Sequence, residues 1–355
     1  MVALASPPVR QSQQFIHHFS PALIDRSFTG KHIVTVEQFT RPDLTDLFAA
    51  TNQLRKRVRA GDRDVLRLCA GKIMATLFYE ASTRTDMSFQ AAMLRLGGEV
   101  IATAGGVQFS SVYKGENLAD TVRALGCYAD VVVLRHPDVG SSYEAAYYLD
   151  QMSRQLERTP IVISGGDGIG EHPTQALLDL YTILDCKGSP DNLNITMVGD
   201  LLYGRTVHSL SKLLAQYTTT GTTLNLVSPR SQRMPEAIVK HVRERGINIY
   251  ETEELQQVIG TSDVIYWTRI QEERFADRNA YEAIADRFVM TPPVLKQAKS
   301  DAILMHPLPR KHEMGTPDDH DILDADPRAI YFRQMENGMF VRMALLAKVL
   351  GVTEF

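Results

Sequence analysis

A short polar motif in this chain has the chemistry of a phosphate-binding turn. Its residues are small or cationic: Ser82, Thr83, Arg84 and Thr85. They lie between an apolar run at residues 72–78 and an amphipathic segment at residues 87–96, which we interpret as a strand followed by a helix. The first N–H groups of a helix lack intrahelical partners and carry the positive end of its dipole, so they bind anions. A plain serine N-cap beside a surface arginine is the alternative for this motif taken alone.

Cationic or imidazole residues also follow five other apolar runs along the chain. They are Arg135, His172, Arg205, Arg269 and His306. Ligands of open α/β sheets bind beyond the carboxyl ends of the strands, where such residues would gather. Taken singly, each could be an ion-paired or hydrogen-bonded structural residue. Together with the polar motif, they predict a crevice for a ligand that carries several negative groups.

The elements that would position these residues alternate along the chain. Strands are predicted at residues 73–78, 100–102, 131–134, 161–164, 195–198, 224–227, 264–267 and 303–305, with helices between them. The length of 355 residues and the 44% hydrophobic content suit two domains. We therefore predict an α/β fold of two doubly wound domains, each a parallel sheet flanked by helices.

The composition excludes several classes of function. A net charge of −4 and a pI near 6.2 argue against a nucleic-acid or anionic-membrane partner. No apolar run approaches the ~20 residues of a membrane span, so we expect a soluble protein. The scattered cysteines Cys69, Cys127 and Cys186 indicate a reducing compartment and no zinc site, and we expect them to be buried. The glycine-rich segments match no complete nucleotide-binding motif, which ranks a nucleotide site below a small-molecule site.

Residues 1–30 do not fit the alternating pattern. They are rich in Ser, Pro, Gln and His and lack the apolar stretch of a secretory signal. We predict a flexible or partner-covering N-terminal extension. A cleaved organellar transit segment stays open as the alternative, although Asp25 and the few arginines do not fit that pattern.

Several segments, in order along the chain, resemble the catalytic chain of the aspartate carbamoyltransferase family. They are residues 78–85, 110–116, 135–137, 172–175, 205, 268–271 and 306–310. Ornithine carbamoyltransferases have a cysteine in their H-C-L-P motif, where this chain has Pro307. The resemblance implies transfer of a carbamoyl group from carbamoyl phosphate to the α-amino group of L-aspartate, in the committed step of pyrimidine biosynthesis. It also implies no metal and no organic cofactor.

The resemblance further assigns roles to residues of this sequence. The residues implied in binding carbamoyl phosphate are Ser82, Thr83, Arg84, Thr85, Ser110, Lys114, Arg135, His172, Gln175, Pro307 and Leu308. Those implied in binding aspartate are Lys114, Arg205, Arg269 and Gln271, and those implied in catalysis are Arg84, Thr85, Arg135, His172 and Lys114. A cis peptide bond between Leu308 and Pro309 and ion pairs of Glu80 that tie the two domains together are implied as well. Glu171, where some members have glutamine, adds negative charge near the anion site.

The family's architecture implies how the parts are assembled. The carbamoyl-phosphate domain would comprise residues 31–172 and 337–355, the aspartate domain residues 173–336, and the active site the cleft between them. The loop with Ser110 and Lys114 would cross to a neighbouring subunit of a cytoplasmic homotrimer, although a plain surface loop is the alternative from its composition. Regulatory or dihydroorotase chains stay open as further partners. Two other functions stay open: a carbamoyltransferase for another amine, and a silent homologue that acts as a scaffold.

Overall fold

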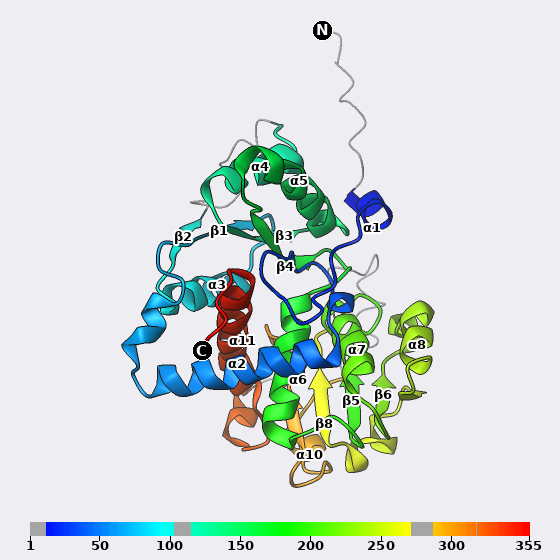
Figure 1. Ribbon diagram of the computed structural model, residues 1–355. Helices are drawn as coiled ribbons and strands as arrows, with labels where there is room; N and C mark the ends of the chain where they lie inside the picture. The colour runs from blue at the N-terminus through cyan, green and yellow to red at the C-terminus, as the bar shows by residue number, and fades with distance from the viewer. Residues whose placement is uncertain (1–11, 103–114, 271–286, 317) are drawn as a thin grey trace. The chain divides into compact units, whose positions relative to one another are not determined.

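The computed structural model describes residues 12–102, 115–270, 287–316 and 318–355 (Figure 1). The chain divides into two compact units, one of Met1–Pro173 and Arg342–Phe355 and one of Thr174–Val341. We call them unit 1 and unit 2. Their boundaries lie after Pro173 and after Val341, whereas the sequence had placed them after His172 and after Glu336.

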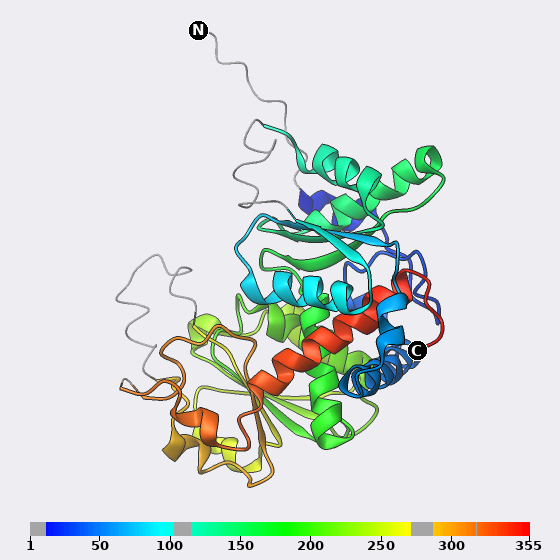
Figure 2. The ribbon, with the colours of Figure 1, turned by 90° about the vertical axis from the view of Figure 1, so that its left-hand side faces the viewer.

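Unit 1 contains a four-stranded parallel sheet of order β2-β1-β3-β4. Its strands are β1 Ile73–Phe78, β2 Glu99–Ala102, β3 Val131–His136 and β4 Ile161–Asp167. Its helices are α1 Phe15–His18, α2 Arg41–Arg59, α3 Thr83–Arg95, α4 Leu118–Tyr128 and α5 Ser141–Leu156. Helices α4 and α5 cover one face of the sheet and α3 covers the other (Figure 2).

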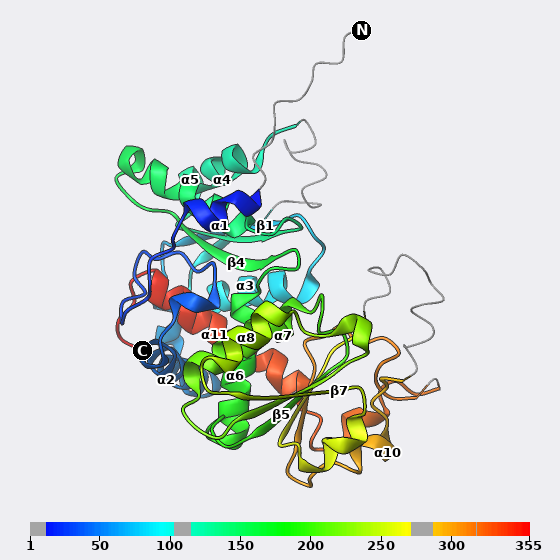
Figure 3. The same ribbon diagram turned by 90° about the vertical axis from the view of Figure 1, so that its right-hand side faces the viewer.

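Unit 2 contains a five-stranded parallel sheet of order β7-β6-β5-β8-β9. Its strands are β5 Asn194–Val198, β6 Thr223–Val227, β7 Asn248–Thr252, β8 Val264–Trp267 and β9 Ile303–Met305. Its helices are α6 Pro173–Lys187, α7 Arg205–Tyr217, α8 Glu236–Arg243, α10 Pro292–Leu295 and α11 Tyr331–Val349, of which α11 continues into unit 1. Helices α7 and α8 lie on the same face of this sheet (Figure 3).

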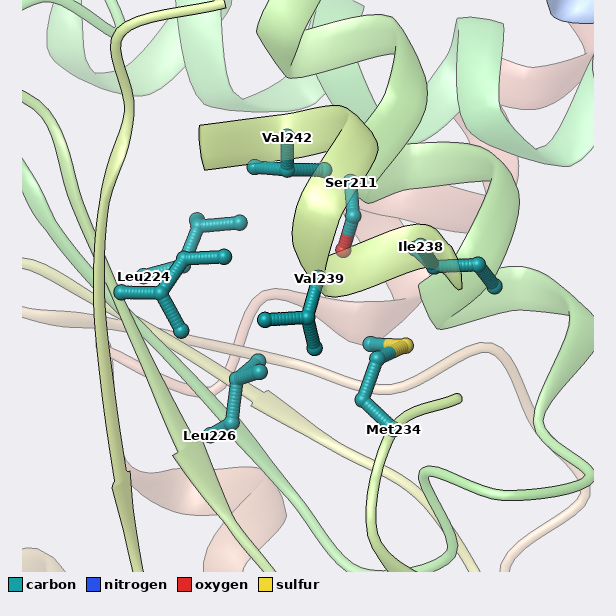
Figure 4. Close-up of a pocket in the computed structure, with 8 residues that line it drawn as sticks. Ser211, Leu224, Leu226, Met234, Ile238, Val239 and Val242 are labelled. Atoms are coloured by element: carbon teal, nitrogen blue, oxygen red, sulfur yellow. The ribbon is translucent and has the colours of Figure 1, made fainter. Parts of the chain in front are cut away.

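Side chains alternate between the two faces of the unit 2 sheet. Leu224 and Leu226 of β6 meet Val239 and Val242 of α8 in a small apolar pocket (Figure 4). Val227 joins the core on the other face, with Trp267 and Leu295 among its members. This alternation follows from the two-residue period of a strand. The pocket under α8 is lined by apolar side chains and Ser211, so it offers no charged group to an anionic substrate.

The predicted fold class is confirmed, because both sheets are parallel and flanked by helices. The predicted bounds of β1, β8 and β9 equal those in the structure. Strand β7 was missed. It forms the edge of its sheet, and its residues are exposed or half-buried, so it lacks the continuous apolar run of a buried parallel strand.

The expectation of a flexible extension over residues 1–30 is wrong for residues 12–30. Phe15, Ile24 and Phe28 are buried there. The Phe15 ring lies 5.4 Å from that of Tyr147 on α5, and Ser12 Oγ donates a hydrogen bond of 2.6 Å to Glu144 Oε2. These contacts make the segment part of the unit 1 core. Residues 1–11 lie outside the described part of the chain.

The cysteines differ in their environments. Cys69 is buried, and burial raises the pKa of its thiol to about 12. Cys127 is exposed and Cys186 is half-buried, so the expectation of buried cysteines is correct for Cys69 alone. Within the described residues, no helix has both the length and the apolar character needed to cross a membrane.

Gly97 packs its backbone against a neighbouring turn and offers a test of the unit 1 core. It has φ +80°, and a Cβ at this position would lie 1.6 Å from the backbone oxygen of Leu66. We expect Gly97→Ala to lower the free energy of unfolding by at least about 3 kcal/mol in urea titrations. Gly61 has a similar φ of +71° with nothing within 4 Å of its Cβ position, so Gly61→Ala should cost only about 1 kcal/mol. Equal losses would contradict the close packing at Gly97.

Candidate active site

The polar motif at residues 82–85 begins helix α3, directly after strand β1. Ser82 is the N-cap residue, but its side chain makes no capping hydrogen bond to the helix. Its Oγ instead accepts a hydrogen bond of 3.1 Å from Arg135 Nη1. Ser82 therefore does not act as a plain N-cap. The first turn of α3 keeps N–H groups that the Ser82 side chain does not satisfy, beside a guanidinium held by that same side chain.

Arg135 comes from the end of strand β3, where it pairs in register with Phe78 of β1. This pairing brings it next to the segment that follows β1. Its Nε donates a hydrogen bond of 3.1 Å to Glu80 Oε2, and its side chain is only 16% exposed. Glu80 and Ser82 therefore fix the plane of the Arg135 guanidinium.

Two guanidinium groups lie close together at this point. Burial lowers the pKa of Arg135. The charge and hydrogen bond of Glu80 offset part of this effect, and the nearby charge of Arg84 lowers the pKa further. Partial burial also lowers the pKa of Arg84, although the residue as a whole is exposed. Two cations that repel each other beside a helix N-terminus are stabilised by an anion between them.

His172 and Thr85 lie side by side in unit 1. Thr85 Oγ1 lies 3.4 Å from His172 Nε2, and both residues are buried. Two hydrogen bonds orient the carboxylate of the neighbouring Glu171. Its Oε2 accepts from Thr35 Oγ1 at 3.0 Å and from Val36 N at 2.9 Å. These bonds hold the Glu171 carboxylate, whose charge the sequence had raised as a concern for the anion site, against Thr35 and Val36.

The expected residues of unit 2 follow neighbouring strands. Arg205 is the first residue of α7, after β5, and Arg269 follows β8. Pro307 and Leu308 follow β9. Strands β5, β8 and β9 are adjacent and parallel, so these residues leave the sheet at one edge. Both arginines are half-buried.

Gln175 and Leu308 are fixed by hydrogen bonds within unit 2. Gln175 Nε2 donates a hydrogen bond of 2.9 Å to Asp179 Oδ1, and the Leu308 N–H donates one of 2.8 Å to His306 Nδ1. The Leu308–Pro309 bond is cis, as the resemblance implied. Three expected site residues, Ser110, Lys114 and Gln271, lie outside the described residues. In the described ranges no group of three or more His, Cys, Asp or Glu residues could hold a metal ion.

Two family models match consecutive parts of the chain. Residues 31–185 match the aspartate/ornithine carbamoyltransferase carbamoyl-P binding domain, and residues 191–349 match the Asp/Orn binding domain. The chain belongs to the aspartate/ornithine carbamoyltransferase family. The two matched segments correspond closely to the two units, apart from the crossing helix α11.

Individual family members extend this match. The chain is 47% identical over 348 residues to the multifunctional protein CAD of Squalus acanthias, covering 98% of this chain but 14% of that protein. It is 44% identical to the aspartate carbamoyltransferase catalytic subunit of Methanocella arvoryzae, covering 92% of this chain and 99% of that subunit. Aspartate transcarbamoylase from Trypanosoma cruzi, solved with carbamoyl phosphate, superimposes with a TM-score of 0.82 at 42% identity, covering 91% of this chain and 97% of that one. The chain thus spans about one seventh of the multifunctional relatives it matches.

The sequence did not predict the partners that orient the candidate site residues. Glu80 was expected to tie the two domains, and in unit 1 its carboxylate holds Arg135. Asp179 was not singled out, although it lies four residues after Gln175 on one helix and such pairs face each other. That spacing was the signal available in the sequence.

Glu80 provides a test of how Arg135 is oriented. Glu80→Gln keeps the side-chain length but removes the charge that offsets Arg135. We expect kcat/KM for carbamoyl phosphate to fall about tenfold, because a charge-assisted hydrogen bond becomes a neutral one. Initial rates at saturating aspartate measure this. Glu99→Gln on exposed strand β2 is the control and should leave the rate unchanged; equal rates in both variants would contradict the role of Glu80.

Proposed function

We propose that this chain is an aspartate carbamoyltransferase. It transfers the carbamoyl group of carbamoyl phosphate to the α-amino group of L-aspartate and yields N-carbamoyl-L-aspartate and phosphate. The observation that carries the proposal is the pair of neighbouring guanidiniums, Arg84 and Arg135, at the N-terminus of α3. A relative with this activity in its name supports the proposal, as does a related transcarbamoylase whose crystal structure was determined in complex with carbamoyl phosphate and aspartate.

The phosphate would bind to the first turn of α3. Ser82, Thr83, Arg84 and Thr85 would supply donors, and Arg135 would span the phosphate and the carbonyl oxygen. The attack of the amine places negative charge on that carbonyl oxygen. Donors already directed at it, from Thr85, Arg135 and His172, would each lower the barrier by about 3 kcal/mol.

The remaining groups would hold the carbamoyl NH2 and the amino acid. Gln175 Oε1 and the carbonyl oxygens of Pro307 and Leu308 would accept from the NH2 group. The carboxylates of aspartate would bind Arg205, Arg269, Gln271 and Lys114, since two guanidiniums fix a dicarboxylate by bidentate contacts. The departing phosphate would take the amine proton, so orientation and charge stabilisation supply the rate.

The assembly is proposed on the same basis. Residues 31–172 and 337–355 would bind carbamoyl phosphate, residues 173–336 would bind aspartate, and the site would lie in the cleft between them. Ser110 and Lys114 would complete the site of the next subunit in a cytoplasmic homotrimer. The match to much longer multifunctional proteins favours partner enzymes. Regulatory or dihydroorotase chains are the candidates that the family resemblance implies.

Two alternatives make different demands on the chain. A transferase for a cationic amine would need acidic groups in place of Arg205 and Arg269. A silent scaffold would have no need to keep Arg84, Arg135 and His172 together. Residue types therefore favour an active enzyme for a dicarboxylate.

Product analysis tests the proposal. The purified chain would be incubated with carbamoyl phosphate and, in separate reactions, aspartate, ornithine, putrescine or N-acetylornithine. Among the four acceptors, we expect ureido product only with aspartate. Light scattering of the same sample should give the mass of a trimer. Product formed with another acceptor, or no product with any of the four acceptors, would contradict the proposal.

A further inference from the structure

A buried carboxylate in unit 2, Asp179 on α6, accepts hydrogen bonds from three side chains. Gln175 Nε2 and Gln334 Nε2 donate to Oδ1 at 2.9 and 2.6 Å, and Tyr266 Oη donates to Oδ2 at 2.7 Å. Asp179 and Tyr266 are fully buried, and Gln334 is 1% exposed. The three donors belong to α6, α11 and β8. Asp179 is therefore the common acceptor of three elements.

This arrangement fixes which way each amide faces. Each of these bonds has a side-chain N–H or O–H as the donor and an Asp179 carboxylate oxygen as the acceptor. Gln175 and Gln334 must therefore turn their NH2 groups toward Asp179 and their oxygens away from it. Burial, and then the charge of Asp179, raise the pKa of Tyr266 well above its usual value, so its hydroxyl keeps its proton and stays a donor.

The orientation of Gln334 is passed on to the segment after strand β9. Gln334 Oε1 accepts the His306 N–H at 3.0 Å, and His306 Nδ1 accepts the Leu308 N–H at 2.8 Å. His306 Nδ1 therefore carries no proton, and Nε2 carries one and lies 3.1 Å from Glu313 Oε1. Each bond in this series has one allowed direction.

Leu308 needs such support because of its backbone. Its φ is +54°, in the left-handed region that a residue with a Cβ rarely adopts. Conformations of this kind persist where surrounding contacts determine them. The series from Asp179 through Gln334 and His306 holds the Leu308 N–H. Because this N–H lies in one peptide plane with the Pro307 carbonyl, the series also fixes the direction of that carbonyl.

We propose that Asp179 is a positioning residue that makes this site select a carbamoyl group over an acyl group without an NH2. It fixes the directions of Gln175 Oε1 and of the Pro307 carbonyl as acceptors beside the Leu308 carbonyl, which match the N–H groups of carbamoyl phosphate. Acetyl phosphate has a methyl group at that position and leaves these acceptors without donors. The inference rests on the proposed carbamoyl transfer.

The test compares two acyl phosphates on the whole enzyme. The selectivity ratio is the inhibition constant of acetyl phosphate divided by the KM of carbamoyl phosphate, both measured at saturating aspartate. Asp179→Leu removes the acceptor of all three donors, and we expect the ratio to fall about 10- to 100-fold. Asp179→Asn keeps Oδ1 for both amides, while Tyr266 Oη can turn to accept from its NH2. This conservative variant should stay within about threefold of wild type.

Asp185→Leu is the matched control for a purely stabilising role. Asp185 lies on the same helix and also bonds to α11, through Arg333 and Asn337. We expect it to lower the melting temperature and leave the selectivity ratio unchanged. The inhibition constant of inorganic phosphate, which tests unit 1, should be unchanged in every variant.

The outcomes separate the two claims. A wild-type protein that forms no carbamoyl aspartate overturns the proposed function itself. A wild-type enzyme with normal turnover and an Asp179→Leu variant with an unchanged ratio overturn the positioning role alone. If Asp179→Leu does not fold, Gln334→Met decides, because it removes the link between Asp179 and His306 and leaves Asp179 with its bonds from Gln175 and Tyr266. A ratio at least about threefold lower supports the proposal, and an unchanged ratio overturns it.

Discussion

Arg135→Ala is expected to lower kcat/KM for carbamoyl phosphate by at least about 10³-fold. The side chain would contribute both to phosphate binding and to stabilisation of the oxyanion, and removal of one oxyanion donor alone costs about 10²- to 10³-fold. In the wild-type protein the Glu80 carboxylate is paired with Arg135. The variant leaves this carboxylate unpaired with Arg135 and close to an incoming dianion. Repulsion between them would add to the loss.

The controls for this prediction separate charge from geometry. Arg135→Lys keeps the charge but cannot reach Glu80 and Ser82 with a planar fork, so an intermediate loss of about 10²-fold is expected. Arg67→Ala removes an exposed arginine of the same unit and should change nothing. Steady-state rates would be measured on samples with matched circular dichroism spectra. An Arg135→Ala enzyme with a tenth or more of wild-type activity would rule out the assigned role.

Mixed trimers of two inactive variants should regain activity. If Lys114 acts in the site of the neighbouring subunit, a Lys114→Ala chain still offers its own Arg84, and an Arg84→Ala chain still offers its Lys114. Each mixed trimer would contain one complete site and show about one third of wild-type activity. The parent variants should each retain less than about 1%.

The double variant Lys114→Ala/Arg84→Ala is the matched control for mixing. Its subunits cannot complete a site with either single variant, so those mixtures should stay inactive. Mixed trimers would be separated by different affinity tags and verified by mass before assay. Verified mixed trimers without recovered activity would contradict the shared site.

Buried parallel strands were the part of the fold that the sequence predicted best. β8 and β9 are continuous apolar runs and β1 is interrupted only by Thr76, because helices or loops cover both faces of a parallel sheet. The segment at residues 12–30 was misjudged for the opposite reason. Its core residues Phe15, Ile24 and Phe28 recur at no regular period, and apolar residues between them such as Ile16 and Leu23 are exposed, so only tertiary contacts reveal which are buried.

Candidate site residues were easier to propose from the sequence than the contacts that orient them. Arg135 follows an apolar run and stands out by type and position. Its bonds to Glu80 and Ser82 join residues more than 50 positions apart, which no local pattern encodes. The same holds for Gln334, which reaches Asp179 across 155 positions. Spacing on one helix could have indicated only the Gln175–Asp179 pair.

Binding of N-(phosphonacetyl)-L-aspartate, with which a related transcarbamoylase has been solved, tests most directly whether these cations hold both substrates at once. Titration calorimetry should give one site per chain with a Kd below about 1 µM, because the compound joins both charged parts in one molecule. Arg84→Ala and Arg269→Ala, one in each unit, should each weaken it by at least about 100-fold. Absence of binding at millimolar concentration, or tight binding that neither variant changes, would contradict the account.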